Sequence, residues 1–139
     1  MPRTLKSITL EDARRMLSAA QAKAASLDIA YNIAVVDAGA HLVAFLRQDG
    51  GLIAGIDLAI NKAVTARIVE KSTSDLAGLA QPGMPLFGIQ ESMASEVVIF
   101  GGGIPIVSGG DIIGAVGTSA GTVEQDIAVA QAALAALDT

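Results

Sequence analysis

A run of small residues that leads into a helix is the first place where this sequence could bind a ligand. Residues 114–121 read Gly-Ala-Val-Gly-Thr-Ser-Ala-Gly, and Thr122 is followed three residues later by Gln125. Thr122 and Gln125 form a capping box, which predicts a helix from there to about residue 137. A helix start carries unpaired N–H groups and a partial positive charge, which stabilise a carboxylate or phosphate. The candidate ligand-binding residues here are Gly117, Thr118, Ser119, Gly121 and Thr122.

Two acidic residues at the same helix start favour a different interpretation. Glu124 and Asp126 lie in the first turn, where they compete for the same positive field. A self-capped turn between a strand and a helix, with no ligand, is therefore the structural alternative. The acidic pairs of the chain, Glu124 with Asp126 among them, are best interpreted as solvent-facing or capping carboxylates.

His41 and Lys62 are the other side chains suited to chemistry. His41 is the only histidine, just after a predicted turn at residues 38–39, and it either ligates a haem iron or is a hydrogen-bonded structural residue. Lys62 stands in an apolar helical stretch, so its ammonium either enters a ligand pocket or is solvated or ion-paired, for example with Asp57. The candidate acids, bases or binding groups of a catalytic site are His41, Lys62 and Glu124.

Several classes of site are excluded by residues that the sequence lacks. With no cysteine and one histidine, the chain has no disulfide, zinc–thiolate site, iron–sulfur cluster or multi-histidine metal site. Its glycine spacing matches neither the dinucleotide fingerprint nor the Walker loop. His41 is the candidate axial ligand of a haem iron, and Tyr31, Met84 and Met93 are the other possible protein ligands.

Composition limits the partners that we expect. The 139 residues carry a formal net charge of −5, with three Phe, one Tyr and no Trp, so neither nucleic acid nor an anionic membrane is an expected partner. No apolar run approaches the ~20 residues of a membrane-spanning helix, and the first residues lack the apolar core of a signal peptide. These features predict one domain, residues 1–139, in the cytoplasm.

The order of predicted elements is typical of an α+β domain. Helices are predicted at 10–26, 53–71 and 122–137, and a short helix that is capped by Ser72 or Ser74 is predicted to end at residue 79. Strands are predicted at 31–37, 40–47, 97–100, 104–107 and 112–118. Residues 101–103 are predicted to connect two strands, and 81–88 to form a loop. The resulting order, α-β-β-α-α-β-β-β-α, predicts an antiparallel sheet of about five strands flanked by helices.

The predicted helix at 53–71 is apolar around most of its circumference, whereas a surface helix keeps its apolar residues to one stripe. The whole chain is 52% hydrophobic and 17% charged, with a mean hydropathy of +0.56. These features predict a homo-oligomer, a dimer or larger, that associates through apolar helical faces. An alanine-rich monomer is the alternative.

Four segments of the sequence, taken together, resemble the GlcG/HbpS-like family, also called the haem-degrading domain. They are residues 33–50, 60–66, 102–106 and 114–126, and the resemblance covers essentially the whole chain in the same order. The family includes the C-terminal domain of PduO-type proteins. The resemblance implies a profilin-like sheet with flanking helices, assembled into homo-oligomers. It places the family's hairpin histidine at His41, its helix lysine at Lys62, and its small-residue loop and acidic helix start at 117–121 and 124–126.

Three functions follow as hypotheses. The resemblance implies an oligomer that binds haem or another tetrapyrrole, linked to haem breakdown or redox sensing. His41 or a methionine would then ligate iron, while Lys62 and residues 118–122 meet the propionates. The second hypothesis is an enzyme acting on a small aromatic or carboxylated metabolite through Lys62, His41 and Glu124. The third is a scaffold or sensor module without a small ligand.

Overall fold

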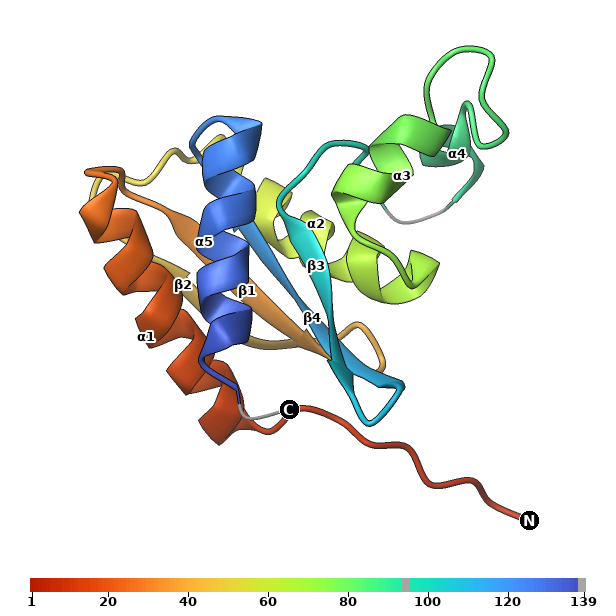
Figure 1. Cartoon of the computed structure of the whole chain (residues 1–139), viewed down its shortest axis with the longest axis horizontal. Helices are drawn as coiled ribbons and strands as arrows, with labels where there is room; N and C mark the ends of the chain where they lie inside the picture. Colours follow the sequence, from red (N-terminus) through yellow and green to blue (C-terminus); the bar gives the residue numbers. More distant parts are fainter. Residues whose placement is uncertain (94–95, 138–139) are drawn as a thin grey trace.

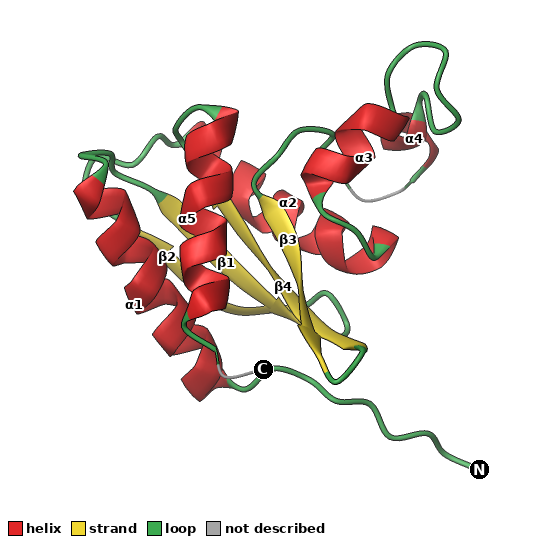
Figure 2. Cartoon of the chain, viewed as in Figure 1, coloured by secondary structure: helices red, strands yellow, loops and turns green. Residues whose placement is uncertain are grey.

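The computed structural model describes residues 1–93 and 96–137, which form helices packed on a single sheet (Figures 1 and 2). The elements in chain order are α1 (Leu10–Ser26), β1 (Asn32–Asp37), β2 (Leu42–Arg47), α2 (Ala54–Val69), α3 (Thr73–Leu79), α4 (Ile89–Ser92), β3 (Gly103–Ser108), β4 (Asp111–Ser119) and α5 (Val123–Ala135). In this description, no helix is both long and apolar enough to span a bilayer.

The sheet has four antiparallel strands in the order β2-β1-β4-β3. Two hairpins, β1–β2 and β3–β4, meet at its centre, where Asn32 lies opposite Ser119 and Asp37 opposite Gly114. The α+β prediction with an antiparallel sheet is thus confirmed. The predicted count of about five strands was one too high.

The segment at 97–100 was predicted to be a strand, but it is not part of the sheet. Val97 and Val98 are buried, but the segment has no regular secondary structure and lies outside the sheet. The Val98 N–H donates to Thr65 Oγ1 of α2 at 3.0 Å. This apolar run therefore packs on a helix, and Gly103 begins β3 instead of ending a hairpin connection.

Helices cover the two faces of the sheet. On one face, α1 and α5 pack on the β1 side chains Ile33 and Val35, and on the other, α2 packs on Ala34 and Val36. This follows from the strand period of two, which sends neighbouring side chains to opposite faces. The approach of α2 to the sheet is close, because a Cβ on Gly117 of β4 would lie 2.0 Å from the Ala59 carbonyl oxygen.

Among the described residues, the start of α2 and one position near its end leave apolar side chains exposed. Alanines at 59, 63 and 66 face the sheet, whereas Ile53, just before the helix, is 77% exposed and Ile68 is 37% exposed. The helix therefore carries apolar residues on both of its sides, as the sequence predicts.

Local caps fix both long helices that cover the first face. The Thr9 side chain accepts a hydrogen bond from the Asp12 N–H at the start of α1. At the start of α5, Thr122 and Gln125 form both hydrogen bonds of the predicted capping box. These bonds satisfy N–H groups that a helix start would otherwise leave unpaired.

Candidate functional site

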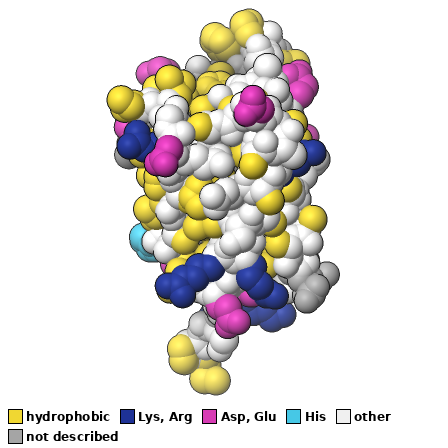
Figure 3. Space-filling view, turned by 90° about the vertical axis from the view of Figure 1, so that its left-hand side faces the viewer, with side chains coloured by type: hydrophobic (Ala, Val, Ile, Leu, Met, Phe, Trp, Pro, Cys, Tyr) yellow, Lys and Arg dark blue, Asp and Glu magenta, His cyan; other side chains and the backbone are white. Residues whose placement is uncertain are grey.

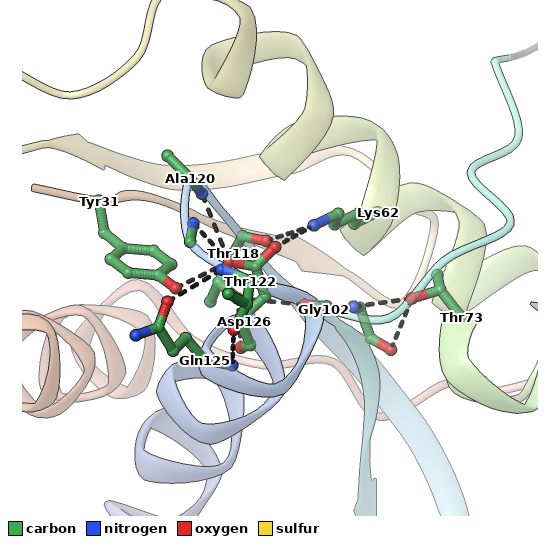
Figure 4. Close-up of polar contacts among 11 residues, drawn as sticks. Tyr31, Lys62, Thr73, Gly102, Thr118, Ala120, Thr122, Gln125 and Asp126 are labelled. Carbon is green, nitrogen blue, oxygen red and sulfur yellow. Dashed lines mark hydrogen bonds and ion pairs between the residues drawn. The ribbon is translucent and has the colours of Figure 1, made fainter. Parts of the chain in front are cut away.

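Lys62 and Asp126 form a buried ion pair between helices that lie on opposite faces of the sheet (Figure 4). The Lys62 Nζ lies 2.7 Å from Asp126 Oδ2 and 2.9 Å from the Thr118 carbonyl oxygen. The two side chains are only 1% and 6% exposed. Of the two interpretations of Lys62, ion pairing is therefore the one seen, and the partner is Asp126 instead of Asp57.

Asp126 also accepts hydrogen bonds from backbone N–H groups of the turn between β4 and α5. Its Oδ1 accepts from the Gly121 N–H at 3.0 Å and, more weakly, from the Ala120 N–H at 3.4 Å. Ala120 has φ +143°, a conformation that costs a non-glycine residue energy and needs support from its surroundings. The interpretation of Asp126 as a solvent-facing or simple capping residue was wrong, because its carboxylate is buried at the centre of a network.

Tyr31, the residue just before β1, completes this network. Its hydroxyl donates to Asp126 Oδ1 at 2.7 Å, and the ring is fully buried. Burial, and then the hydrogen bond to Asp126, raise the pKa of Tyr31 well above its usual range. Tyr31 is thus neutral and serves as a donor.

The predicted anion cradle is present, but it holds a carboxylate of the same chain. The N–H groups of residues 120 and 121 and the Lys62 ammonium converge on Asp126, and the Thr118 hydroxyl donates to the Asp126 carbonyl oxygen at 2.6 Å. Thr118 and Ser119 are buried in β4, whereas Gly121, Thr122 and Glu124 are exposed at the corner and helix start. An external anion is not needed to explain these donors.

The segment before β3 covers the Lys62 ammonium. The Phe100 ring centroid lies 5.2 Å from Nζ, a cation–π contact, although the ring is 42% exposed. Gly102 has φ +128°, and a Cβ there would lie 2.8 Å from Nζ. Burial lowers the pKa of Lys62 below its ordinary value, and the hydrogen bond and charge of Asp126 only partly offset that effect.

His41 lies in a different part of the molecule, on the turn between β1 and β2. Its side chain is 84% exposed, and its Nδ1 lies 3.6 Å from Asp37 Oδ1. The same Asp37 oxygen accepts from the backbone N–H groups of Gly39 and His41, at 2.9 Å each. In Figure 3, the imidazole, in cyan, stands on the margin of a face with hydrophobic side chains along its middle.

The register of the sheet separates His41 from the Lys62 network. Thr118, beside Lys62, lies opposite Ile33, and the His41 turn begins at Asp37, which lies opposite Gly114. Four strand residues separate these positions, about 13 Å at ~3.3 Å per residue. The structure thus groups Lys62 with residues 118–122, and it does not bring His41 to them.

A motif that was not used in the sequence analysis lies in the same corner. Residues 117–121 fit the pattern Gly-x-Ser-x-Gly, which is typical of a nucleophilic serine at a strand-to-helix turn. Ser119 does lie at the end of a strand, but it is 3% exposed. The only histidine of the chain is on the distant turn, so no imidazole is placed to activate this serine.

Comparison with known proteins gives one consistent result. A sequence model of the family described as "Haem degrading protein HbpS-like" matches residues 8–135. An uncharacterised 15.0 kDa protein from the dhaT-dhaS intergenic region of Citrobacter freundii is 39% identical over 130 residues, covering 94% of this chain and 92% of the relative.

Solved structures agree with the sequence matches. Klebsiella pneumoniae protein ORFY superposes with a TM-score of 0.94 at 36% identity, over 97% of this chain and 93% of that one. A structure described as the PduOC:Heme complex superposes with a TM-score of 0.91 at 33% identity, over 95% of this chain and 96% of that one.

Proposed function

This chain belongs to the HbpS-like family of haem-degrading proteins, and from that premise we propose that it binds haem or a related tetrapyrrole. The observation that carries the proposal is the likeness, over 95% of the chain, to a structure described as a PduOC:Heme complex. A link to haem breakdown or redox sensing is the finer part of the same proposal.

The surroundings of His41 fit an iron ligand. A histidine that binds a metal usually turns its other ring nitrogen toward a carboxylate or carbonyl, which fixes the ring and raises its basicity. Here Nδ1 lies 3.6 Å from the Asp37 carboxylate. No described residue hydrogen-bonds to Nε2, so that nitrogen is available to iron. A Cβ on Gly39 would lie 2.8 Å from Nδ1, so this glycine lets the ring lie over the turn.

An exposed leucine beside His41 suits contact with a flat apolar macrocycle. Leu42, next to His41, is 50% exposed at the start of the edge strand β2. Bound iron would supply the redox and oxygen chemistry, and this chain would hold and orient the imidazole. Met84 and Met93, which are 43% and 38% exposed, are the alternative ligands. Because Lys62 is committed to Asp126, the propionates need other partners.

A titration with haemin tests this function. We expect the wild-type protein to give a saturable, shifted Soret band, and His41→Ala to change the band position as well as the affinity. Added imidazole should restore the band position in that variant, because it can replace the lost ligand. The matched control is Met84→Leu with Met93→Leu, which should leave the spectrum unchanged. A wild-type protein with no saturable spectrum would refute haem binding, and an unchanged spectrum in His41→Ala would refute ligation by His41.

Self-association belongs to the same proposal. Exposed apolar residues just before α2, Leu52 and Ile53, and Ile68 within it support a homo-oligomer, because burial of such surface drives protein association. Sedimentation at micromolar concentration should show a dimer or larger. Ile53→Asp should dissociate it, whereas Leu5→Asp, at an exposed position outside α2, should not. A monomeric wild type would overturn this part.

A further inference from the structure

A hollow of about 510 Å³ lies beside the turn that carries His41. Its walls come from the N-terminal segment, the β1–β2 turn, the end of α2 and the β3–β4 hairpin, and they include Leu5, Lys6, Ala38, Arg67, Glu70, Asp111 and Ile112. Its volume lies within the range of small-molecule sites, about 300–1,000 Å³. Because Ala38 belongs to the same turn as His41, the hollow begins next to the candidate iron ligand.

Arg67 is the side chain of this hollow that is best suited to bind a ligand. It stands in the last turn of α2, and its Nε donates to the Ala38 carbonyl oxygen at 2.6 Å. The side chain is only 21% exposed, and it lines the hollow. An arginine that is fixed in this way is ready for a carboxylate, because its planar fork of donors matches the two carboxylate oxygens.

The terminal nitrogens of this guanidinium are available to a ligand. A guanidinium has five N–H donors, and Arg67 uses the one on Nε for the turn. Among the described residues, its other polar contact is Glu70, whose Oε1 lies 3.7 Å from Nη1, beyond hydrogen-bond distance. The Glu70 side chain is mostly exposed, so it can turn into solvent when another carboxylate arrives.

One turn presents both the guanidinium and the imidazole. Ala38 and His41 are three positions apart, so their Cα atoms lie within about 11 Å of each other. The imidazole lies over Gly39, and the guanidinium binds the neighbouring residue, Ala38. A haem carries its iron at the centre of the macrocycle and its two carboxylates at one edge, on short flexible chains. A cation beside the axial ligand is therefore placed to hold that edge.

We infer that Arg67 binds a carboxylate of the tetrapyrrole whose iron His41 ligates. The inference rests on the proposed function, and it supplies the cationic partner that the buried Lys62 cannot provide. The carboxylate accepts hydrogen bonds from the terminal nitrogens of the Arg67 fork. Lys6 and Asp111, which also line the hollow, pair with each other at 3.7 Å, so together they add no net charge that would oppose the ligand.

Haemin and its dimethyl ester test this inference, because the ester keeps the iron and the macrocycle but has no free carboxylate. Each compound would be titrated into the intact protein, with the Soret band as the measure of affinity and of ligation. Arg67→Met should weaken the binding of haemin about 10-fold or more, the equivalent of one charge-assisted hydrogen bond. The variant should bind the ester as the wild type does, and its band position should not move, because His41 still ligates the iron.

Two further variants supply a control and a change of opposite sign. Arg47→Met removes an exposed arginine at the other end of the β1–β2 hairpin, opposite Asn32, and should leave both affinities unchanged. Glu70→Gln should tighten the binding of haemin, because it removes a carboxylate that competes for the Arg67 guanidinium. Its binding of the ester should not change.

The outcomes separate this inference from the proposed function. If Arg67→Met binds haemin as tightly as the wild type, the role of Arg67 is overturned and haem binding stands. If the variant loses affinity for haemin and the ester alike, Arg67 supports the turn instead of the carboxylate, and its role is again overturned. Should Arg67→Met fail to fold, an unchanged affinity for haemin in Glu70→Gln overturns it. A wild type with no saturable spectrum for either compound refutes haem binding itself, and this inference with it.

Discussion

Removal of the Lys62 ammonium should be among the most damaging single changes in this protein. In Lys62→Met, the apolar stem is largely kept, but Asp126 Oδ2 loses its ammonium donor while the carboxylate remains buried. Breaking a buried ion pair from one side typically costs about 3–5 kcal/mol, because an uncompensated charge is left in the interior. For 139 residues, that loss corresponds to a fall in Tm of roughly 10–17 °C.

The measurement is urea unfolding followed by circular dichroism, with a matched control on the surface. Lys6 pairs with Asp111 at 3.7 Å, and both side chains are more than 60% exposed, at 62% and 63%. Lys6→Met should therefore change the free energy of unfolding by at most about 1 kcal/mol. Adding Asp126→Asn to Lys62→Met should recover part of the loss, since the buried charge is then removed with its partner.

One result would refute this reasoning. If Lys62→Met and Lys6→Met lower the free energy of unfolding by the same small amount, the Lys62–Asp126 pair contributes no more than a surface ion pair. If the double variant is then no more stable than Lys62→Met alone, the two side chains are not coupled.

Three further outcomes are expected. Burial raises the pKa of Tyr31 above its ordinary 10.0, so above that pH only the unfolded chain releases this proton and stability falls as pH rises. Tyr31→Phe should flatten that fall in urea unfolding at pH 9 to 11, and equal slopes would contradict it. Gly117→Ala should lower the free energy of unfolding by about 3 kcal/mol, the upper end for overpacking, because the new Cβ meets the Ala59 carbonyl oxygen. A decrease of less than about 1 kcal/mol in the same assay would contradict so close an approach of α2 to the sheet. Thr122→Ala should cost about 1 kcal/mol through the lost cap, with Thr122→Ser as a near-neutral control in thermal melts.

Features with a local cause were predictable from the sequence. The start of α5 was placed by Thr122, because a capping side chain bonds to an N–H only three residues ahead. The β1–β2 hairpin followed from a short turn between two β-rich runs. The family resemblance, which rests on motifs in order along the chain, was confirmed by the match to residues 8–135.

The features that depend on distant partners were not predicted. Periodicity cannot distinguish a strand from an extended apolar segment, and the 97–100 segment packs on Thr65 of α2 instead of entering the sheet. The burial of Asp126 depends on Lys62, sixty-four residues away, so no local pattern around Asp126 reveals it. A signal was nevertheless present for Lys62: it stands in a helix that is apolar around most of its circumference, and buried charges must be paired.

The order of the strands in the sheet also determines when contacts can form during synthesis of the chain. The centre of the sheet joins β1 to β4, so Asn32 can pair only after Ser119 has been synthesised. The Lys62 ammonium likewise lacks its counter-ion until Asp126 has been added. A ribosome releases residues in order, and the alanine-rich face of α2 and the valines of β1 remain without their final cover until the chain has reached β4. Until β4 and α5 have been synthesised, such a chain exposes apolar surface and unpaired strand edges, which favour aggregation.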